Sequence, residues 1–319
     1  MSENFKWLNS IDERGMKMEY TIYKLEFQTG VHFGTGMLNE SAYTFQADQL
    51  FSALYIEALK LECADQFYEM VCDDRILFSD AFPYIKQKYM VPKPMIYVKP
   101  LEQGISEKKK LFKKIKYIPI ELLNDFINGR LQIENDPMSG YGKSAQQSMA
   151  NVRNDEDTLP YRVGTYYYNE GCGLYIIVAY EDEIAKYIME DLLEALSYTG
   201  IGGKKSSGLG KFILKTGKMP EILMFHLKNK TEKSMLLSTA LPKEQELEVV
   251  LENASYQLVR RSGYVASEKY ADEWRKKKDL YVFAAGSCFE KRFIGDIYNV
   301  ALQGTHPVYR YAKGLFMGV

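Results

Sequence analysis

A glycine-rich loop, residues 200–210, carries the side chains in this sequence that are best suited to binding an anion. Glycines let the backbone approach a ligand closely, and exposed amides, hydroxyls and lysines together suit a chain of phosphates. No Walker register fits, and a dinucleotide fingerprint would follow a strand, whereas this loop follows a predicted helix. The ordinary alternative is a flexible helix-to-strand connection. We predict that the ligand contacts Gly202, Gly203, Lys204, Lys205, Ser206, Ser207, Gly208 and Gly210.

A second glycine loop, residues 30–36, which we call the first-strand loop, contains His32, Phe33 and Gly34. We expect it to be exposed and to lie beside the glycine-rich loop at one edge of a sheet. As a general base, His32 would need a group to orient it and another to protonate the leaving group. The sequence shows no such group, so stacking, hydrogen bonding or packing is favoured over catalysis.

Charged segments elsewhere offer weaker candidates. Arg260 and Arg261 are predicted at the tip of a hairpin, and Arg292 follows a turn that contains glycine; each suits a phosphate contact or a surface ion pair. Six lysines between residues 108 and 116 alternate with apolar residues, which predicts a helix with one basic face or a solvated surface. The acidic residues 155–157 are better explained as a turn than as a metal site.

These loops need a scaffold, and the hydrophobic pattern provides one. Residues 20–29 alternate apolar and polar side chains and predict a strand, which is followed by a helix that Asp48 caps. Residues 174–180 predict a buried strand, 181–197 an amphipathic helix and 211–215 a further strand. The order is that of a ferredoxin-like βαββαβ unit with its middle hairpin expanded.

We therefore predict an α+β protein with two ferredoxin-like (RRM-like) domains. A tail (1–18) precedes a first domain (19–215), which contains a long insertion at about 83–162, and a smaller second domain covers 216–319. Long loops inside compact domains are usually functional or mobile. The elements predicted for the second domain are a helix at 244–252 and strands at 222–227, 235–240, 256–261, 280–285, 308–313 and 315–319.

Composition restricts the class of protein. The 319 residues include 41 Lys plus Arg and 42 Asp plus Glu, so any basic surface must be local. The 25 Tyr and 16 Phe suit subunit interfaces and stacking, or equally a tyrosine-rich core. Four scattered cysteines and three histidines predict free thiols, no metal site and no cofactor. The absence of a long apolar run predicts a cytoplasmic protein with no membrane contact.

Several of these segments resemble the RAMP superfamily of CRISPR proteins. Phe33-Gly34 with Ala47–Leu54 (ADQLFSAL) is similar to the N-terminal signature of that superfamily, and residues 200–210 resemble its glycine-rich loop. Segments near the C-terminus narrow the resemblance to the family of fourth subunits of the type III-A Csm effector complex: 285–287, 295–297 and 306–311. The resemblance covers nearly the whole chain from about Met18.

The resemblance implies a non-catalytic subunit in antiviral defence that binds the 5′ repeat-derived tag of CRISPR RNA (crRNA). It implies contacts with the large polymerase-like Csm subunit and with the backbone RAMP subunit, and a thumb-like insertion near the target RNA. The glycine-rich loop holds the strongest RNA-binding candidates. The second rank is His32, Phe33 and Gly34, and the third is Arg260, Arg261, Ser287 and Arg292.

Two other functions remain open at this level. Relatives in the superfamily cut CRISPR repeats without a metal, and His32 is the residue that would serve as the base. Alternatively, the chain is a purely structural subunit that makes no direct contact with RNA, and its basic loops bind acidic protein surfaces.

Overall fold

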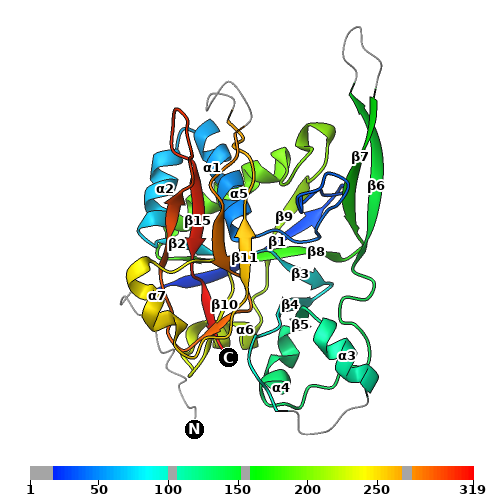
Figure 1. The fold of residues 1–319 in the computed structure, drawn as a ribbon, viewed down its shortest axis with the longest axis vertical. Coiled ribbons are helices and arrows are strands. Elements are labelled where there is room, and N and C mark those ends of the chain that lie inside the picture. The colour runs from blue at the N-terminus through cyan, green and yellow to red at the C-terminus, as the bar shows by residue number, and fades with distance from the viewer. Residues whose placement is uncertain (1–16, 100–105, 152–158, 268–274) are drawn as a thin grey trace, which may run out of the picture.

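An antiparallel sheet of seven strands forms the centre of the computed structural model, which describes residues 17–99, 106–151, 159–267 and 275–319. The strand order is β5-β4-β3-β8-β1-β9, and β2 pairs with β8 beyond β3. Figure 1 shows the sheet with its helices and a long hairpin that stands away from it. The strands are β1 (Glu19–Phe27), β2 (Ile76–Phe78), β3 (Phe82–Ile85), β4 (Lys88–Pro92), β5 (Tyr117–Pro119), β8 (Cys172–Tyr180) and β9 (Phe212–Gly217).

Both faces of this sheet are covered. Tyr23 and Leu25 of β1 enter one core, whereas Ile22 enters a second core on the opposite face. All nine residues of β8 are buried, as expected for a strand with neighbours on both sides and cores on both faces. The strands predicted at 20–29, 174–180 and 211–215 are therefore confirmed, within two residues at each end.

Three helices build the first core. They are α1 (Ala47–Lys60), α2 (Ala64–Cys72) and α5 (Glu183–Thr199). Helix α5 joins β8 to β9, and the Asp182 carboxylate caps it by accepting a hydrogen bond from the amide of Ala185, 2.8 Å away. The predicted amphipathic helix is confirmed, since Met189, Leu192 and Leu196 are fully buried.

The predicted N-cap of α1 is wrong. The helix begins at Ala47 with Gln46 as its N-cap, so Asp48 lies inside the first turn and is buried. The Ala47 amide instead donates to the carboxylate of Asp80, 33 residues away, at 2.8 Å. A local contact also closes this end of the helix, because the Gln46 amide donates to Gln49 Oε1 at 3.1 Å, and the prediction missed both contacts.

The segment between β3 and β8 contains a small lobe and the hairpin. The lobe has α3 (Ser106–Lys114), the 3-10 turn η1 (Ile120–Leu122) and α4 (Leu123–Ile127), and the hairpin has β6 (Gly142–Asn151) and β7 (Leu159–Tyr168). The insertion predicted at 83–162 differs from this arrangement at both ends. Residues 83–92 belong to β3 and β4 of the central sheet, and β7 continues to Tyr168.

The C-terminal part begins with α6 (Glu221–Lys228), where a strand was predicted at 222–227. Leu223 and Leu227 are four residues apart and both are buried, which is the spacing of one face of a helix. The short apolar run had been interpreted as a strand. The predicted helix at 244–252 is confirmed. The remaining elements are β10 (Ser234–Leu236), α7 (Glu244–Leu251), β11 (Leu258–Arg261), β12 (Leu280–Phe283), β13 (Cys288–Phe289), β14 (Gly295–Asn299), β15 (Tyr309–Lys313) and β16 (Phe316–Gly318).

The C-terminal part shares its cores with the rest of the molecule. Tyr311 of β15 stacks on Phe78 of β2 at a ring distance of 4.3 Å, and Met235 of β10 enters the second core. The predicted tail (1–18) falls mainly outside the described residues, although Met18 is described and buried. All four cysteines are free thiols, as predicted. In the described part of the chain, no helix combines the length and apolarity needed to cross a membrane.

Candidate nucleic-acid interface

The two glycine loops pack against each other, as the sequence predicts. The Gly203 amide donates to the His32 carbonyl at 2.8 Å, and the Gly210 amide donates to the Gly30 carbonyl at 3.0 Å. A Cβ atom on Gly202 would lie 2.8 Å from the same His32 carbonyl oxygen, so the approach requires glycine. The pairing of β1 with β9 brings the loops together, because one loop follows β1 and the other precedes β9.

The glycine-rich loop displays polar groups on a strained backbone. Lys204 has a φ of +59°, and a 3-10 turn over Lys205–Ser207 follows it. Ser206 and Ser207 are exposed, whereas Lys204 and Lys205 are partly buried. Among the described residues, no acceptor is found for the amides of Gly202, Lys204, Lys205 and Ser206. Unused amides beside two hydroxyls and two ammonium groups are the groups that a phosphate chain needs.

The two lysines are positioned by different neighbours. The Lys204 ammonium lies 4.7 Å from the ring centre of Tyr161 in β7 and 3.3 Å from its hydroxyl. Lys205 faces the end of α1, where burial lowers its pKa and the Glu57 carboxylate partly offsets that effect. Glu57 itself is buried and accepts a hydrogen bond from the hydroxyl of Thr199 at 2.9 Å. The loop is thus attached at both sides rather than freely flexible.

His32 is buried, which corrects the expectation of an exposed loop. Its side chain is 7% exposed, and Nδ1 lies 2.7 Å from the Gly164 carbonyl oxygen. Because a carbonyl oxygen only accepts, Nδ1 carries the proton and Nε2 holds the lone pair. Phe33 is also buried, with its ring edge-on to Phe45 at 5.1 Å. Of the three predicted residues in this loop, only Gly34 is exposed.

The hairpin β6–β7 adds a third element to this site. Its inner strand pairs with the first-strand loop, where Val31 and Tyr166 exchange backbone hydrogen bonds of 2.9 Å. From there the two strands project from the molecule (Figure 1). Lys143, Ser148 and Arg162 are exposed along it. The small polar residues of β6 have little strand preference, so no sequence pattern predicted this hairpin.

Arg260 and Arg261, two of the third-rank candidates, differ in how far their side chains are exposed to a ligand. Arg260 is exposed, with a 3.9 Å ion pair to Asp279, and can reach a ligand. Arg261 is only 18% exposed and binds the Asp48 carboxylate through two hydrogen bonds of 2.8 and 3.0 Å. Both arginines lie at the end of β11, where a long connection to β12 begins. The side chain of Arg261 is thus already engaged by Asp48.

Ser287 and Arg292 are engaged within the fold. The Ser287 side chain is completely buried and donates to the Ala284 carbonyl oxygen at 2.7 Å, so it leaves no surface for RNA. The Nε of Arg292 donates to the Ser234 hydroxyl at 2.9 Å. These two residues have structural partners, so we do not assign them a contact with phosphate.

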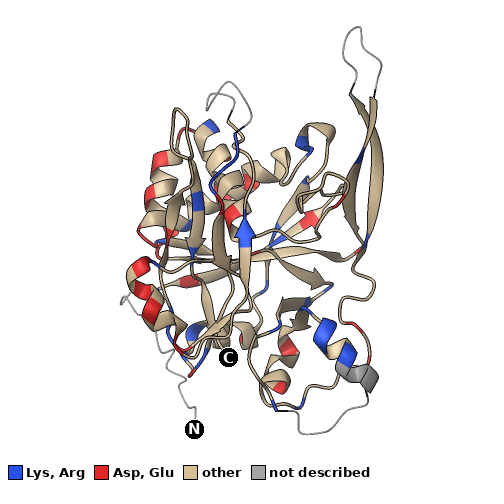
Figure 2. Cartoon of the chain, in the orientation of Figure 1, with Lys and Arg blue, Asp and Glu red and all other residues tan. Residues whose placement is uncertain are grey.

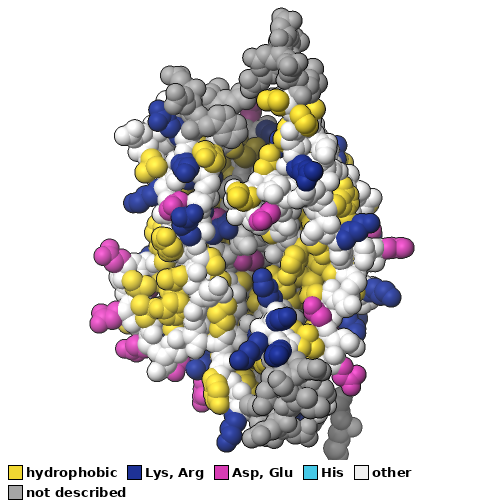
Figure 3. Space-filling model, turned by 45° about the vertical axis from the view of Figure 1, so that its right-hand side comes forward, with side chains coloured by type: hydrophobic (Ala, Val, Ile, Leu, Met, Phe, Trp, Pro, Cys, Tyr) yellow, Lys and Arg dark blue, Asp and Glu magenta, His cyan; other side chains and the backbone are white. Residues whose placement is uncertain are grey.

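Other charged segments lie apart from the loops. The predicted basic helix is confirmed as α3, where Lys110, Lys113 and Lys114 are exposed while Phe112 stacks on Phe126 at 5.8 Å. Figure 2 shows the blue segments of α3 in the lower lobe. Figure 3, in which the right-hand side of Figure 1 comes forward, shows basic side chains grouped below the middle of the view. The acidic residues 155–157 lie outside the described residues.

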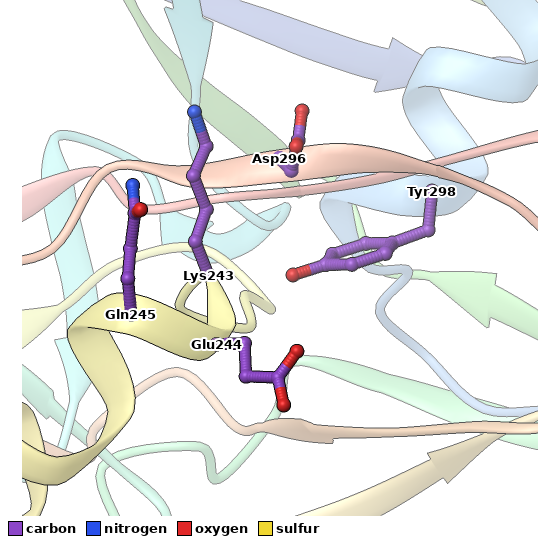
Figure 4. A pocket seen from close by; sticks show the side chains of 5 residues that line it. All are labelled: Lys243, Glu244, Gln245, Asp296 and Tyr298. Carbon is purple, nitrogen blue, oxygen red and sulfur yellow. The ribbon is translucent and has the colours of Figure 1, made fainter.

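A pocket of about 540 Å³ lies on the other side of the molecule from the hairpin, where α7 meets β14. Lys243, Glu244, Gln245, Asp296 and Tyr298 line it (Figure 4). Its mixture of one cation and two acids matches neither a phosphate chain nor a metal site. In the described ranges, no three His, Cys, Asp or Glu side chains are grouped so that they could hold a metal ion.

A mixed α and β structure built on an antiparallel sheet is consistent with the RAMP class of CRISPR proteins, whose glycine-rich loop the sequence resembles. Sequence comparison identifies the family within this class. The chain is 36% identical over 308 residues to "CRISPR system Cms protein Csm4" of Mycobacterium tuberculosis (strain ATCC 25618 / H37Rv), covering 95% of this chain and 98% of that protein. The Streptococcus thermophilus protein of the same name is also 36% identical, with 94% and 98% covered.

The C-terminal residues give the same result. Residues 229–319 match the model of the CRISPR Csm4 C-terminal domain. The chain therefore belongs to the Csm4 family.

Solved structures agree with this fold. One match is a chain in the crystal structure of the Csm3-Csm4 subcomplex of the type III-A CRISPR-Cas interference complex, with a TM-score of 0.63 and 19% sequence identity. The match covers 94% of this chain and 99% of that chain. A chain in the Csm1-Csm4 cassette bound to AMPPNP gives a TM-score of 0.56, 17% identity and coverage of 94% and 98%.

Proposed function

We propose that this chain is a non-catalytic subunit of a type III-A CRISPR RNA-guided antiviral effector complex that binds the 5′ repeat-derived tag of crRNA. The observation that carries the proposal is the interlocked pair of glycine loops. It presents Lys204, Lys205, Ser206 and Ser207 beside backbone amides that have no acceptor among the described residues. Single-stranded RNA is held by such amides and cations, together with stacking on aromatic rings.

The site has the properties of a binding surface rather than of an enzyme pocket. It lies on an outer loop, and Tyr161 stands beside Lys204 as the nearest ring for stacking. The hairpin β6–β7, with Lys143 and Arg162 exposed, suits the thumb-like element that approaches the target RNA. We place the complex in the cytoplasm.

The proposed protein partners are the large polymerase-like subunit and the backbone RAMP subunit, which this chain would anchor to each other. The support is that related Csm4 chains have been crystallised with Csm1 and with Csm3. Exposed apolar side chains on α5 suit a protein interface: Ile184, Tyr187 and Tyr198 are 59%, 65% and 70% exposed. Ile184 and Tyr187 lie in the first half of α5, whereas Tyr198 directly precedes the glycine-rich loop.

We also propose that residues 19–215 and 216–319 are two ferredoxin-like domains. In the first, the order β9-β1-β8-β3, with helices after β1 and β8, is that of a βαββαβ unit. In the second, the segment after β10 bridges from Ala240 to Phe283 of β12, and the Leu241 amide donates to the Ala312 carbonyl of β15. These bonds connect the segment after β10 to the hairpins β11–β12 and β14–β15.

One observation favours a second candidate, a metal-independent repeat endoribonuclease. The Nδ1 of His32 is fixed by the Gly164 carbonyl, which leaves the Nε2 lone pair as a potential base. The side chain is, however, 7% exposed, which restricts its contact with RNA. A further candidate is an assembly subunit that does not touch RNA.

The test measures binding and cleavage of a labelled crRNA that carries its 5′ tag, without metal, for the wild type and for Lys204→Gln/Lys205→Gln. Under the proposal the RNA stays intact, and the variant binds more weakly with a salt slope reduced by about 0.7 for each phosphate that it no longer neutralises. Lys230→Gln/Lys291→Gln is the control, because it removes the same charge at two exposed lysines elsewhere.

The other outcomes identify the rival functions. Cleavage within the repeat that disappears in His32→Ala would establish the nuclease. Equal affinity of the two double variants, measured alone and with the large and backbone subunits present, would establish the purely structural role.

A further inference from the structure

Two arginines bind one carboxylate where α1 meets the C-terminal part, and Lys277 lies near them; we call Asp48, Arg261, Lys277 and Arg310 the junction cluster. Arg261 donates to both Asp48 oxygens at 2.8 and 3.0 Å, and Arg310 Nη1 donates to Oδ2 at 2.9 Å. Lys277 is close enough for Asp48, Arg261 and Arg310 all to affect its titration. Three positive charges therefore share one negative charge.

In the described residues, Asp279 offsets this surplus only in part. Asp279 is the next acid, but it is exposed and pairs with Arg260. Arg310 is 4% exposed, and its Nε is buried without a hydrogen-bond partner. Burial lowers the pKa of both Lys277 and Arg310. Cations that are removed from water without enough counter-charge are costly, and an anion bound beside them offsets that cost.

The backbone holds Lys277 rigidly beside the cluster. Its amide donates to the Gly263 carbonyl at 2.8 Å, and the next amide, of Lys278, donates to Val300 at 2.8 Å. Tyr264 and Lys276 form a β-bridge at the same level. Figure 2 shows a blue segment on β11, near the middle of the view, and further blue segments on the connection above it. These contacts fix the main chain from which the Lys277 side chain extends.

We propose that the junction cluster is an anion site that binds a phosphate group of the RNA backbone. The inference rests on the proposed function for the source of the phosphate. Lys277 and the 18% exposed edge of Arg261 are the groups that the ligand would reach. Arg310 lies beneath them and contributes charge while it holds Asp48. A phosphodiester carries one negative charge, which the surplus in the cluster accommodates.

The test uses Lys277→Met with Lys278→Met as its matched control, since Lys278 is the exposed neighbour on the same segment. Thermal unfolding is followed in inorganic pyrophosphate and in sodium chloride of equal ionic strength. Wild type and Lys278→Met should gain thermal stability specifically in pyrophosphate. Lys277→Met should lose that gain, and without pyrophosphate it should unfold at the same or a higher temperature, because a charge held away from water has been removed.

The second arm measures the affinity for tag-bearing crRNA over a range of salt concentrations. We expect Lys277→Met to bind roughly tenfold more weakly with a salt slope smaller by about 0.7, and Lys278→Met to match the wild type. A pyrophosphate effect that is absent, or equal in both variants, would overturn the anion site even if RNA binds. A Lys277-dependent pyrophosphate effect with unchanged crRNA affinity would overturn RNA as the source of the phosphate.

Discussion

The Asp48 carboxylate in α1 lies 2.9 Å from the Nη1 of Arg310 in β15, and both side chains are almost fully buried. The two residues are 262 positions apart, so this ion pair joins the beginning of the chain to its end. Arg261 binds the other carboxylate oxygen at 2.8 Å. The planar fork of each guanidinium matches a carboxylate better than an ammonium does. Asp48 therefore connects α1 to two strands of the C-terminal part.

Substitution Asp48→Asn should be strongly destabilising. It leaves Arg310 buried and Arg261 partly buried without this counter-charge, and breaking a buried pair in this way costs about 3–5 kcal/mol. The measurement is the free energy of unfolding in urea, obtained from the transition midpoint and slope.

Asp279→Asn is the matched control for that measurement. It removes the partner of Arg260 in an exposed ion pair of 3.9 Å, where a loss of less than about 1 kcal/mol is expected. If both substitutions cost the same, the Asp48 cluster would not be the link between the two parts of the chain.

Asp80 provides a second link, and it should make stability depend on pH. Its carboxylate accepts hydrogen bonds from the Ala47 amide at 2.8 Å and from the Thr239 amide and hydroxyl, both at 2.7 Å. Complete burial nevertheless raises the pKa of Asp80 from 3.8 to about 6. Between these values the folded protein binds more protons than the unfolded chain, so the free energy of unfolding decreases as the pH rises.

The contribution of Asp80 to this decrease is about 3 kcal/mol, and it is complete above pH 6. Asp80→Asn should lack this contribution, because an amide does not titrate and its oxygen still accepts from the Ala47 and Thr239 amides. Urea unfolding of both proteins across this pH window gives the difference directly. Parallel pH profiles for the two proteins would show that the Asp80 carboxylate does not titrate in that window.

The sequence predicted the elements whose pattern is local. The alternation in β1, the apolar run of β8 and the helical period of α5 each lie where they were expected. The packing of the two glycine loops followed from the strand order, because neighbouring strands bring their ends together. Where the apolar segment is short, as in α6, its sequence fits a buried helix and a buried strand equally well, and only the packing of its side chains distinguishes the two.

What the sequence did not reveal depends on partners far along the chain. His32 was expected to be exposed because glycines flank it, yet it is covered once Gly203 and Gly164 reach it from distant segments. Asp48 has the residue type and position of a helix cap, and its arginine partners lie more than 200 residues away. The hairpin β6–β7 was missed because pairing, not strand preference, stabilises its small polar strand.

Gly203→Ala should disturb the contact between the two glycine loops. The added Cβ would lie 2.7 Å from Cδ2 of His32, a ring that is buried and fixed by Gly164. Overpacking of this kind costs about 1–3 kcal/mol, which thermal unfolding would detect. Gly34→Ala is the control, because its Cβ would meet only the His32 Nε2, at an ordinary 3.8 Å. A Gly34→Ala loss as large as that of Gly203→Ala would contradict the proposed fit of the loops.

Glu57 should control the charge of the glycine-rich loop. Its buried carboxylate accepts from Thr199 and from Lys60 at 2.9 and 2.8 Å, and it opposes the effect of burial on the pKa of Lys205. In Glu57→Gln that pKa falls further, so Lys205 loses its proton at a lower pH than in the wild type. If the loop binds RNA, the crRNA affinity of Glu57→Gln should fall below that of the wild type by a margin that grows as the pH rises from neutral.

Thr199→Val separates this charge effect from simple attachment of the loop. It removes the hydrogen bond to Glu57 at a cost of about 1 kcal/mol in stability but leaves the carboxylate beside Lys205. Its crRNA affinity should therefore follow the wild-type pH profile, even where it is lower overall. The same pH dependence in both variants would mean that Glu57 acts only by holding the loop in place, because only one of them changes the charge that Lys205 experiences.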